Sequence, residues 1–376
     1  MYSPPKVFFD REQQSLDYIK AMLDSEVQQG VLGVTFLLGK HYQHTQDSLD
    51  VFLKSLIIPV SGAIFPEVIY DNKYYDDAVI AVLWYETPDI KTFRNISQDD
   101  SALNKHQSDN AAAPASKTSL VFMDTTTRTS EAALDALYYR NGNNYQHAGA
   151  GAGFADGTNR ACILCKDGVV SDSLQVTCLA FTQKNYVGHG WSVLSGPHLV
   201  TTAEENRVIS LDYQPIESYI RERIQEKYAD DLSHIEFQKL VSRFPIGIQL
   251  YDEDMLVRDP LKFEDGALHF IGDIPEFSNV YVLSGEPETL LSYVENNLSH
   301  FESADADQSS LSFIFSCISR RFHMGAKSDA ELEILSQSLN SSNTIIGTSS
   351  LGEIASNNEG LARLHSMSFV VSSLSV

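Results

Sequence analysis

The sequence has few cysteines and few basic residues. Only four of the 376 residues are cysteine, which is too few for a disulfide framework. Lys and Arg total 27 against 50 for Asp and Glu, which gives a formal net charge of -23. A surface this acidic repels phosphate backbones and anionic lipid headgroups. Nucleic-acid and membrane partners are therefore not expected.

Long apolar runs and a secretory leader are also missing. No apolar run reaches the roughly 20 residues that span a bilayer. The first ten residues contain no basic region that leads into an apolar stretch. These absences predict a cytoplasmic, soluble protein.

Signatures of catalysis are missing as well. The sequence contains no Gly-x-Ser-x-Gly, no His-Glu-x-x-His and no paired-carboxylate signature. The histidine nearest to Cys317 in sequence is His323, which has no evident orienting carboxylate. We therefore expect a protein that is not an enzyme. A small-metabolite enzyme that uses Cys317, or the turn glutamates Glu67 and Glu353, stays as an alternative.

The sequence does contain three segments with one shared pattern. Each has an apolar strand, a connection, an amphipathic helix and then a second strand or small-residue turn, and they cover residues 31–67, 119–153 and 310–353. Such strands separated by single helices are typical of crossover units in parallel or mixed sheets. The pattern predicts an α/β protein with mixed sheets, built as two related modules that each have a strand-helix-strand core.

The length indicates more than one domain, because a single core rarely grows past roughly 250 to 300 residues. We predict an N-terminal helix within residues 1–29, a first domain over 30–214 and a second over 215–376. The stretch from about 96 to 118 is polar and aperiodic, and it is predicted to be a mobile loop.

Several short motifs in the second half occur together in a recognisable order. They are Phe244-Pro-Ile-Gly247, Val257-Arg-Asp-Pro260, Phe315 to Arg321 and Ile346 to Ile354. In this order they resemble the FIST C-terminal domain. Upstream, Gly188-His-Gly-Trp191, Gly196-Pro197 and Leu199-Val-Thr201 are similar to the end of the FIST N-terminal domain.

The resemblance implies a sensory role. FIST domains, named for F-box and intracellular signal transduction, are regarded as ligand-binding modules, often associated in bacteria with histidine kinases. It implies a stand-alone bacterial type that binds a small molecule and signals through a separate protein such as a histidine kinase. One subgroup binds haem and senses nitric oxide, so a haem sensor is a second alternative. Where the first module usually has a Gly-Glu turn, this sequence has Pro66-Glu67, and Pro66 stiffens the turn.

Two glutamates occupy equivalent places in the related units. Glu67 and Glu353, the latter preceded by Gly352, each follow a strand, at the sheet edge where open α/β proteins bind ligands. Either could accept a hydrogen bond from an amino group. The alternative is a solvated carboxylate or a structural partner of a nearby arginine.

Three arginines and a cysteine near these strand ends are further candidates. Arg320 and Arg321 follow the strand that holds Cys317, and Arg258 lies in the Arg-Asp-Pro motif. An arginine at a strand end can bind a carboxylate through two hydrogen bonds. Surface salt bridges and a core cysteine are the alternatives.

The glycine run Gly149, Gly151 and Gly153 suggests a ligand-facing turn. A nucleotide site is disfavoured, because no helix follows the run and no P-loop lysine is present. Close backbone packing would explain the same glycines. For haem, His189 beside Trp191 is the first candidate ligand, although a lone histidine is more often structural.

The sequence therefore predicts a small-molecule sensor with an unidentified cofactor state, haem being one option. It also predicts that several candidates share one cavity; they are Glu67, Gly149, Gly151, His189, Arg258, Arg320 and Glu353. No metal site is predicted, apart from His189 if haem is bound. An interaction scaffold without a ligand is the remaining alternative.

Overall fold

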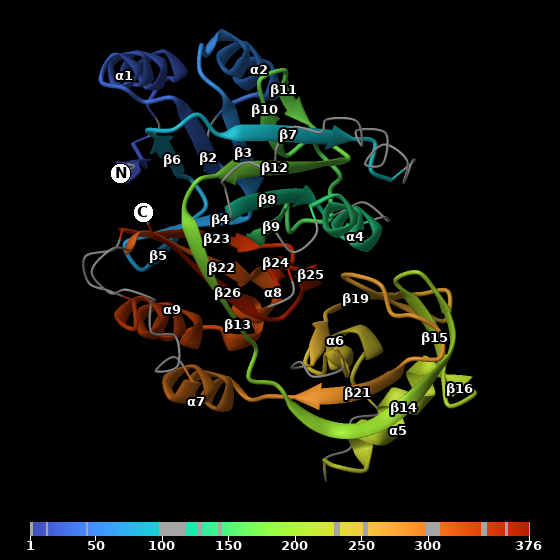
Figure 1. Ribbon diagram of the computed structural model, residues 1–376. Helices are drawn as coiled ribbons and strands as arrows, with labels where there is room; N and C mark the ends of the chain where they lie inside the picture. Colours follow the sequence, from blue (N-terminus) through green and yellow to red (C-terminus); the bar gives the residue numbers. More distant parts are fainter. Residues whose placement is uncertain are drawn as a thin grey trace.

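The computed structural model describes residues 3–12, 14–42, 44–97, 118–125, 130–141, 145–228, 234–250, 255–297, 309–339, 344–357 and 360–375. These residues form four β-sheets with helices packed against them (Figure 1). Within these ranges, no helix combines the length and the apolar character needed to cross a membrane.

The first sheet contains the first predicted strand-helix-strand unit. Its buried strand β2 lies parallel to β3, and α2 (Gln46–Ser55) connects them. Helix α1 (Leu16–Gln28) packs beside α2, and both cover the outer face of the sheet. The spatial order is β1 (Lys6–Asp10), β6 (Val79–Trp84), β2 (Gly33–Gly39), β3 (Val60–Phe65), β10 (Ile163–Cys165) and β11 (Gly168–Val170).

The second sheet contains the second unit, in which β8 lies parallel to β9 and α4 (Ser130–Asn141) connects them. Two strands from the end of the chain complete this sheet. The order is β25 (Ala362–His365), β24 (Glu353–Ser356), β9 (Gln146–Ala152), β8 (Thr118–Asp124), β12 (Ser173–Leu179) and β7 (Asp89–Arg94).

The third sheet contains the third unit. Strands β22 and β23 are parallel, and α8 (Ile318–Met324) and α9 (Lys327–Gln337) connect them. Three of its strands come from the first half of the sequence. The order is β13 (Thr182–Gly188), β26 (Phe369–Ser375), β22 (Ser309–Cys317), β23 (Thr344–Ser350), β4 (Glu67–Tyr70) and β5 (Lys73–Tyr75).

The fourth sheet forms a separate layer, drawn at the lower right of Figure 1, with its own core against α5 (Ile216–Gln225) and α6 (Phe237–Val241). Helix α7 (Pro287–Asn297) follows β21 and packs beside α9. The order is β18 (Leu256–Arg258), β17 (Ile246–Ile248), β21 (Asn279–Ser284), β14 (Ser192–Glu204), β15 (Arg207–Leu211), β20 (Ala267–Phe270) and β19 (Pro260–Glu264), with β16 (Gln214–Pro215) beside β15.

One apolar core joins the first three sheets. Phe65 of the first, Phe122 of the second and Phe315 of the third belong to the same buried cluster. A smaller cluster joins the fourth sheet to these three, where Trp191 and Val257 pack against Met324. The joint between the fourth sheet and the rest is therefore tightly packed on one side.

The predicted fold class is confirmed, since all three units have parallel strands connected by helices. The sheets nevertheless extend across the predicted boundary near residue 214. Strand β4 pairs with β23, and β9 pairs with β24. The domain limits stay a prediction, and most of the predicted loop at 96–118 lies outside the described residues.

Candidate ligand-binding cavity

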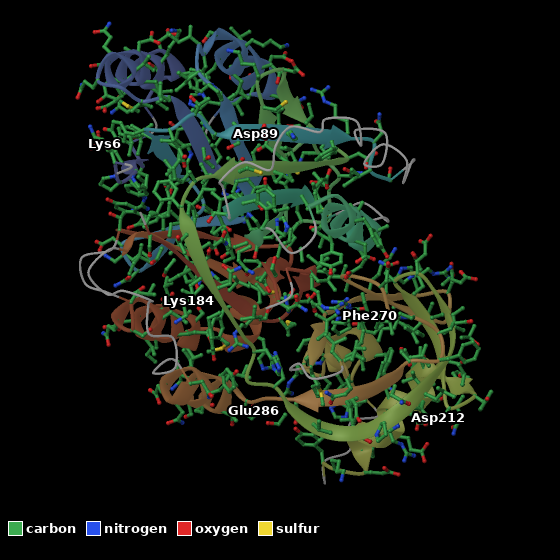
Figure 2. All side chains as sticks on the ribbon, viewed as in Figure 1. Lys6, Asp89, Lys184, Asp212, Phe270 and Glu286 are labelled. Carbon is green, nitrogen blue, oxygen red and sulfur yellow. The ribbon has the colours of Figure 1, made fainter. Side chains whose placement is uncertain are left out.

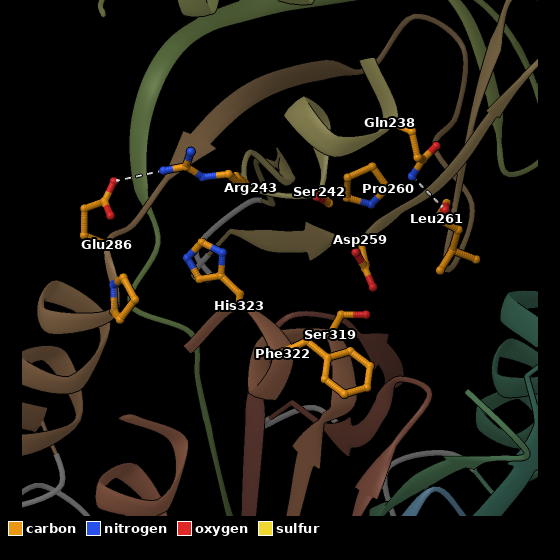
Figure 3. Close-up of a pocket in the computed structure, with 11 residues that line it drawn as sticks. Gln238, Ser242, Arg243, Asp259, Pro260, Leu261, Glu286, Ser319, Phe322 and His323 are labelled. Atoms are coloured by element: carbon orange, nitrogen blue, oxygen red, sulfur yellow. Dashed lines mark hydrogen bonds and ion pairs between the residues drawn. The ribbon is translucent and has the colours of Figure 1, made fainter. Parts of the chain in front are cut away.

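A cavity of about 510 Å³ lies where the fourth sheet meets α8 (Figure 3). We name it the joint cavity. Its walls come from α6 and the residues after it, from the β18–β19 connection, from the start of α7 and from α8. The lining residues are Gln238, Ser242, Arg243, Asp259, Pro260, Leu261, Glu286, Pro287, Ser319, Phe322 and His323.

Helix α8 brings the cavity to the sheet edge where ligands were expected. Strand β22 ends at Cys317, and α8 begins at the next residue. Residues three and four apart share one helix face, so Ser319, Phe322 and His323 point together into the cavity. The cavity therefore lies at the carboxyl end of a parallel strand.

Asp259 forms the buried floor of the joint cavity. The residue is only 3% exposed, and its Oδ2 atom has no hydrogen-bond partner in the described part of the chain. Burial raises the pKa of the Asp259 carboxyl to about 6, although the nearby Ser319 hydroxyl works against this shift. A buried carboxylate oxygen without a donor is costly, and a ligand that donates a hydrogen bond would remove that cost.

Gln238 contributes a second acceptor of the same kind. Its Nε2 donates to the carbonyl of Leu261 at 2.9 Å, which fixes the orientation of the amide. The Oε1 atom is buried and has no partner within the described residues. Two residues that line the joint cavity therefore each have one covered oxygen without a donor within the described residues.

His323 contributes a third acceptor. Its Nε2 lies 2.7 Å from the carbonyl of Gly285 and must donate to it. Burial lowers the pKa of His323, so the ring is neutral near pH 7 and its Nδ1 keeps a lone pair. The ring packs on Trp191 with centroids 4.9 Å apart, which holds its orientation.

The mouth of the joint cavity has charged side chains on one side and apolar side chains on the other. Arg243 and Glu286 face each other at 3.8 Å on one side (Figure 3). Phe322 and Leu261 are exposed at 68% and 50% on the other. A ligand with a donor at one end and an apolar or anionic part at the other would fit this arrangement.

The predicted candidate Arg258 is the last residue of β18 and precedes Asp259, but it is not in the wall of the joint cavity. Its guanidinium donates to the carbonyls of Leu364 and Asp273 at 2.7 and 3.1 Å. It also donates to Glu131 at 2.8 Å. Arg258 is therefore satisfied by protein groups and ties β18 to the second sheet.

The candidates Glu353 and Cys317 lie beneath the joint cavity rather than in its wall. Glu353 is fully buried and accepts hydrogen bonds from Ser350 and Ser368 at 2.8 and 2.6 Å. Burial raises its pKa to about 8, although both serines work against the shift. Burial also raises the pKa of the Cys317 thiol, and the charges of Glu353 and Asp259 add to it. This is the reverse of what a thiolate nucleophile needs.

The arginines after β22 are both engaged by carboxylates of the protein. Arg320 is completely buried, and Glu331, itself 2% exposed, accepts its hydrogen bond at 2.6 Å. Arg321 donates to both oxygens of Glu67 at 2.7 and 3.1 Å, and Ser349 donates to the same carboxylate. Glu67 is thus a structural partner of a nearby arginine, which was the alternative to a ligand-binding role. Arg321 also lines a different cavity of about 720 Å³ with Tyr74.

The glycines of the run 149–153 allow close backbone packing, which was the alternative to a ligand-facing turn. A Cβ on Gly149 would meet the carbonyl oxygen of Val121 at 1.8 Å, and one on Gly151 would meet that of Leu351 at 2.2 Å. Gly153 donates its N–H to the carbonyl of Ile64. Gly352 has φ +100 in the turn before β24. None of these four glycines is in the wall of the joint cavity.

His189 has a tautomer that does not suit haem iron. Its Nδ1 accepts the N–H of Trp191 at 3.0 Å, so in the neutral ring the proton is on Nε2. Its ring also stacks on Tyr293 at 6.2 Å between centroids. The residues around His189 therefore do not fit the predicted haem ligand.

None of the predicted candidates lines the joint cavity, whose wall contains Asp259, Gln238, Arg243 and His323 instead. Asp259 belongs to the Val257-Arg-Asp-Pro260 motif, but the motif does not show which of its two charged residues faces the cavity.

The fold and the joint cavity together define a mixed α/β protein with a ligand-sized cavity at a sheet edge. The FIST N domain matches residues 33–214, and the FIST C domain matches residues 222–356. The chain belongs to the FIST family, whose domains are generally small-ligand-sensing domains of signal transduction.

Other comparisons add little. No curated protein matches the sequence. Among solved structures, a chorismatase crystal structure aligns over 100% of this chain and 99% of its own, at 9% identity and a TM-score of 0.36. A likeness at that level carries no argument about fold or function.

Proposed function

We propose that this protein is a sensor for a small molecule that carries an amino group, and that the molecule binds in the joint cavity. The observation that carries the proposal is the pair of buried acceptors, Asp259 Oδ2 and Gln238 Oε1, that lack donors. A protonated amine brings several N–H donors and a charge opposite to that of Asp259. A net charge of -23 also attracts cations to the protein.

The chemistry of the mouth supports a ligand with a second functional group. Arg243 is the cationic group of the cavity wall, and it is 55% exposed, so it can turn toward a ligand carboxylate. A volume of about 510 Å³ is within the range of small-molecule sites. An amino acid or a related zwitterion satisfies both ends of the cavity.

The position of the joint cavity supports a signalling role. Its walls come from α8 of the third sheet and from α6 and β19 of the fourth-sheet layer. A ligand that contacts both walls favours the relative arrangement in which both contacts are made. We propose that a separate signalling protein, such as a histidine kinase, reads this arrangement.

The test is calorimetric titration with three sets of probes: amino acids, primary amines without a carboxylate, and monocarboxylic acids without an amine. We expect amino acids to bind, amines to bind more weakly and monocarboxylic acids not to bind. Asp259→Asn keeps the shape and removes the charge, so it should weaken binding by roughly 1.5 to 3 kcal/mol, about tenfold to a hundredfold.

The matched control is Asp265→Asn, the same change at an exposed turn of the fourth sheet. It should leave affinity unchanged. Binding by monocarboxylic acids alone, or equal affinity in the Asp259 and Asp265 variants, would remove the amine from the proposal.

A further inference from the structure

A second polar constellation lies on the fourth sheet, away from the joint cavity. It combines Ser195 and His198 of β14, Asp212 of the β15–β16 turn and Tyr219 of α5. Figure 2 labels Asp212 at one end of this sheet and Glu286 of the joint cavity at the other. Ser195 and His198 flank the Gly196-Pro197 segment of the sequence motifs.

The four side chains form one continuous hydrogen-bonded chain. Ser195 Oγ is 3.0 Å from His198 Nε2. His198 Nδ1 is 2.9 Å from the hydroxyl of Tyr219 and 3.5 Å from Asp212 Oδ2. The Tyr219 hydroxyl in turn donates to Asp212 Oδ2.

The protonation states along this chain follow from the donors available. Burial raises the pKa of Tyr219 to about 12, helped by Asp212, so the phenol keeps its proton. Burial alone would raise the pKa of Asp212, but hydrogen bonds from Tyr219 and the N–H of Leu199 outweigh it and lower the pKa. Asp212 is therefore a carboxylate that accepts the one proton of the Tyr219 hydroxyl.

This arrangement fixes the tautomer of His198. The Tyr219 hydroxyl donates its one proton to Asp212, so its oxygen can only accept a hydrogen bond from His198. The histidine proton is therefore on Nδ1. Burial lowers the pKa of His198, which keeps the ring neutral near pH 7. Its Nε2 lone pair then faces Ser195 Oγ, which donates to it.

We infer that Ser195 is an activated nucleophile, with His198 as its general base, and that it accepts an acyl group from a small activated ester. Ser195 Oγ forms a bond to the ester carbonyl carbon while its proton moves to His198 Nε2. The bond from that carbon to the alkoxy oxygen then breaks, and the proton passes to the leaving alcohol. The products are the acylated serine and an alcohol.

Access to Ser195 suits a small reagent. His198 is 6% exposed and held in place, whereas Ser195 is only partly buried and its neighbours Gly196 and Pro197 are exposed. Asp212 and Tyr219 act through His198 as positioning residues. This activity would be independent of ligand binding in the joint cavity.

The experiment is labelling of the full chain with a fluorophosphonate, followed by intact mass and peptide mapping. In that reaction Ser195 Oγ bonds to phosphorus and fluoride leaves, while His198 takes the serine proton. We expect one label on Ser195, none in Ser195→Ala, and normal labelling in Ser192→Ala, an exposed serine of the same strand. No label, or a label that survives Ser195→Ala, would overturn the inference.

The effect of His198 on the labelling rate shows whether Ser195 is activated by a base or is labelled only because it is exposed. His198→Ala should slow labelling about 100-fold or more, the scale of general-base assistance. Because that variant removes a buried ring, Tyr219→Phe and Asp212→Asn serve as second variants, and both should also slow labelling. Equal labelling rates in all folded variants, checked by circular dichroism, would contradict the relay.

The pH profile gives the readout that a structural role would not produce. The groups that face His198 are Asp212, Tyr219, Arg223 and Glu226. The labelling rate should rise with pH as His198 loses its proton, with a midpoint below 6.5, and then level off. A rate that keeps rising into the alkaline range in wild type would mean that no base activates Ser195.

Discussion

Two carboxylates beside strand ends of this molecule differ in how far the protein satisfies them. At the start of β4, the carboxylate of Glu67 receives two hydrogen bonds from Arg321 and one from Ser349. At the joint cavity, Asp259 is more deeply buried and its Oδ2 has no partner among the described residues. A carboxylate that the protein has already satisfied stabilises the fold, whereas one left unsatisfied beside a cavity can select a ligand.

The largest effect is expected where a paired charge is most buried. Arg320→Met leaves Glu331 in the core without its cation, so we expect a loss of about 3 to 5 kcal/mol in the free energy of unfolding. Urea denaturation measures it. The control Lys20→Met breaks a partly exposed pair with Asp24 and should cost less than about 1 kcal/mol. Similar losses in both variants would show that burial of the pair does not matter.

The next largest effect is a gain, rather than a loss, in the free energy of unfolding. Because burial raises the pKa of Asp259 to about 6 from 3.8, its ionisation above that range destabilises the folded state. Asp259→Asn removes this cost and should raise the free energy of unfolding at pH 7 by up to roughly 3 kcal/mol. The same variant loses ligand affinity, so stability and binding change in opposite directions.

The pH dependence gives an independent check of that sign. The folded state binds the Asp259 proton more tightly than the unfolded state, so this group lowers stability as pH rises from about 4 to about 6. The stability difference between Asp259→Asn and wild type should therefore grow across this range and stay constant above it. A difference that is the same at pH 4 and pH 7 would rule out the raised pKa.

Glu67→Gln replaces a carboxylate by an amide, as Asp259→Asn does, but at the carboxylate that the protein has already paired. It weakens two hydrogen bonds to Arg321, and since both side chains are partly exposed, we expect a loss of about 1 to 2 kcal/mol. Thermal and urea unfolding measure it, beside Asp259→Asn. A gain in stability here would contradict the distinction between the two carboxylates.

The smallest effect is expected on ligand affinity when Glu353 is changed. Its pKa of about 8 leaves the acid mostly protonated at pH 7, and it does not line the joint cavity. Glu353→Gln should therefore change ligand affinity in calorimetry by less than about twofold. A tenfold loss would return Glu353 to the ligand site.

Much of the fold followed from local pattern. The apolar strands β2, β8 and β22 and the helices α2, α4 and α9 are predicted because each unit buries continuous apolar residues, whereas α8, which follows β22 directly, is not predicted. The pairing of β4 with β23 could not be predicted, because nothing in either strand specifies a partner so distant in sequence. The sheet edge was also predicted, but not which of its polar groups the protein would satisfy.

The site residues show why the rest was missed. Arg258 and Asp259 are adjacent, and only the structure tells which of them turns toward protein acceptors and which toward the cavity. Gln238 and His323 reach the joint cavity from helices that are far apart in the chain. Motif spacing does not report such a meeting, since it depends on how the fourth sheet packs against α8.

One measurement tests whether the unsatisfied carboxylate selects a ligand. Wild type, Asp259→Asn and Asp265→Asn are incubated with a metabolite extract of the host cell, desalted and examined by native mass spectrometry. We expect one small-molecule adduct on wild type and on Asp265→Asn, with the composition of an amine, and its loss from Asp259→Asn. An adduct that persists in Asp259→Asn, or its absence from wild type, would contradict the role that we assign to the joint cavity.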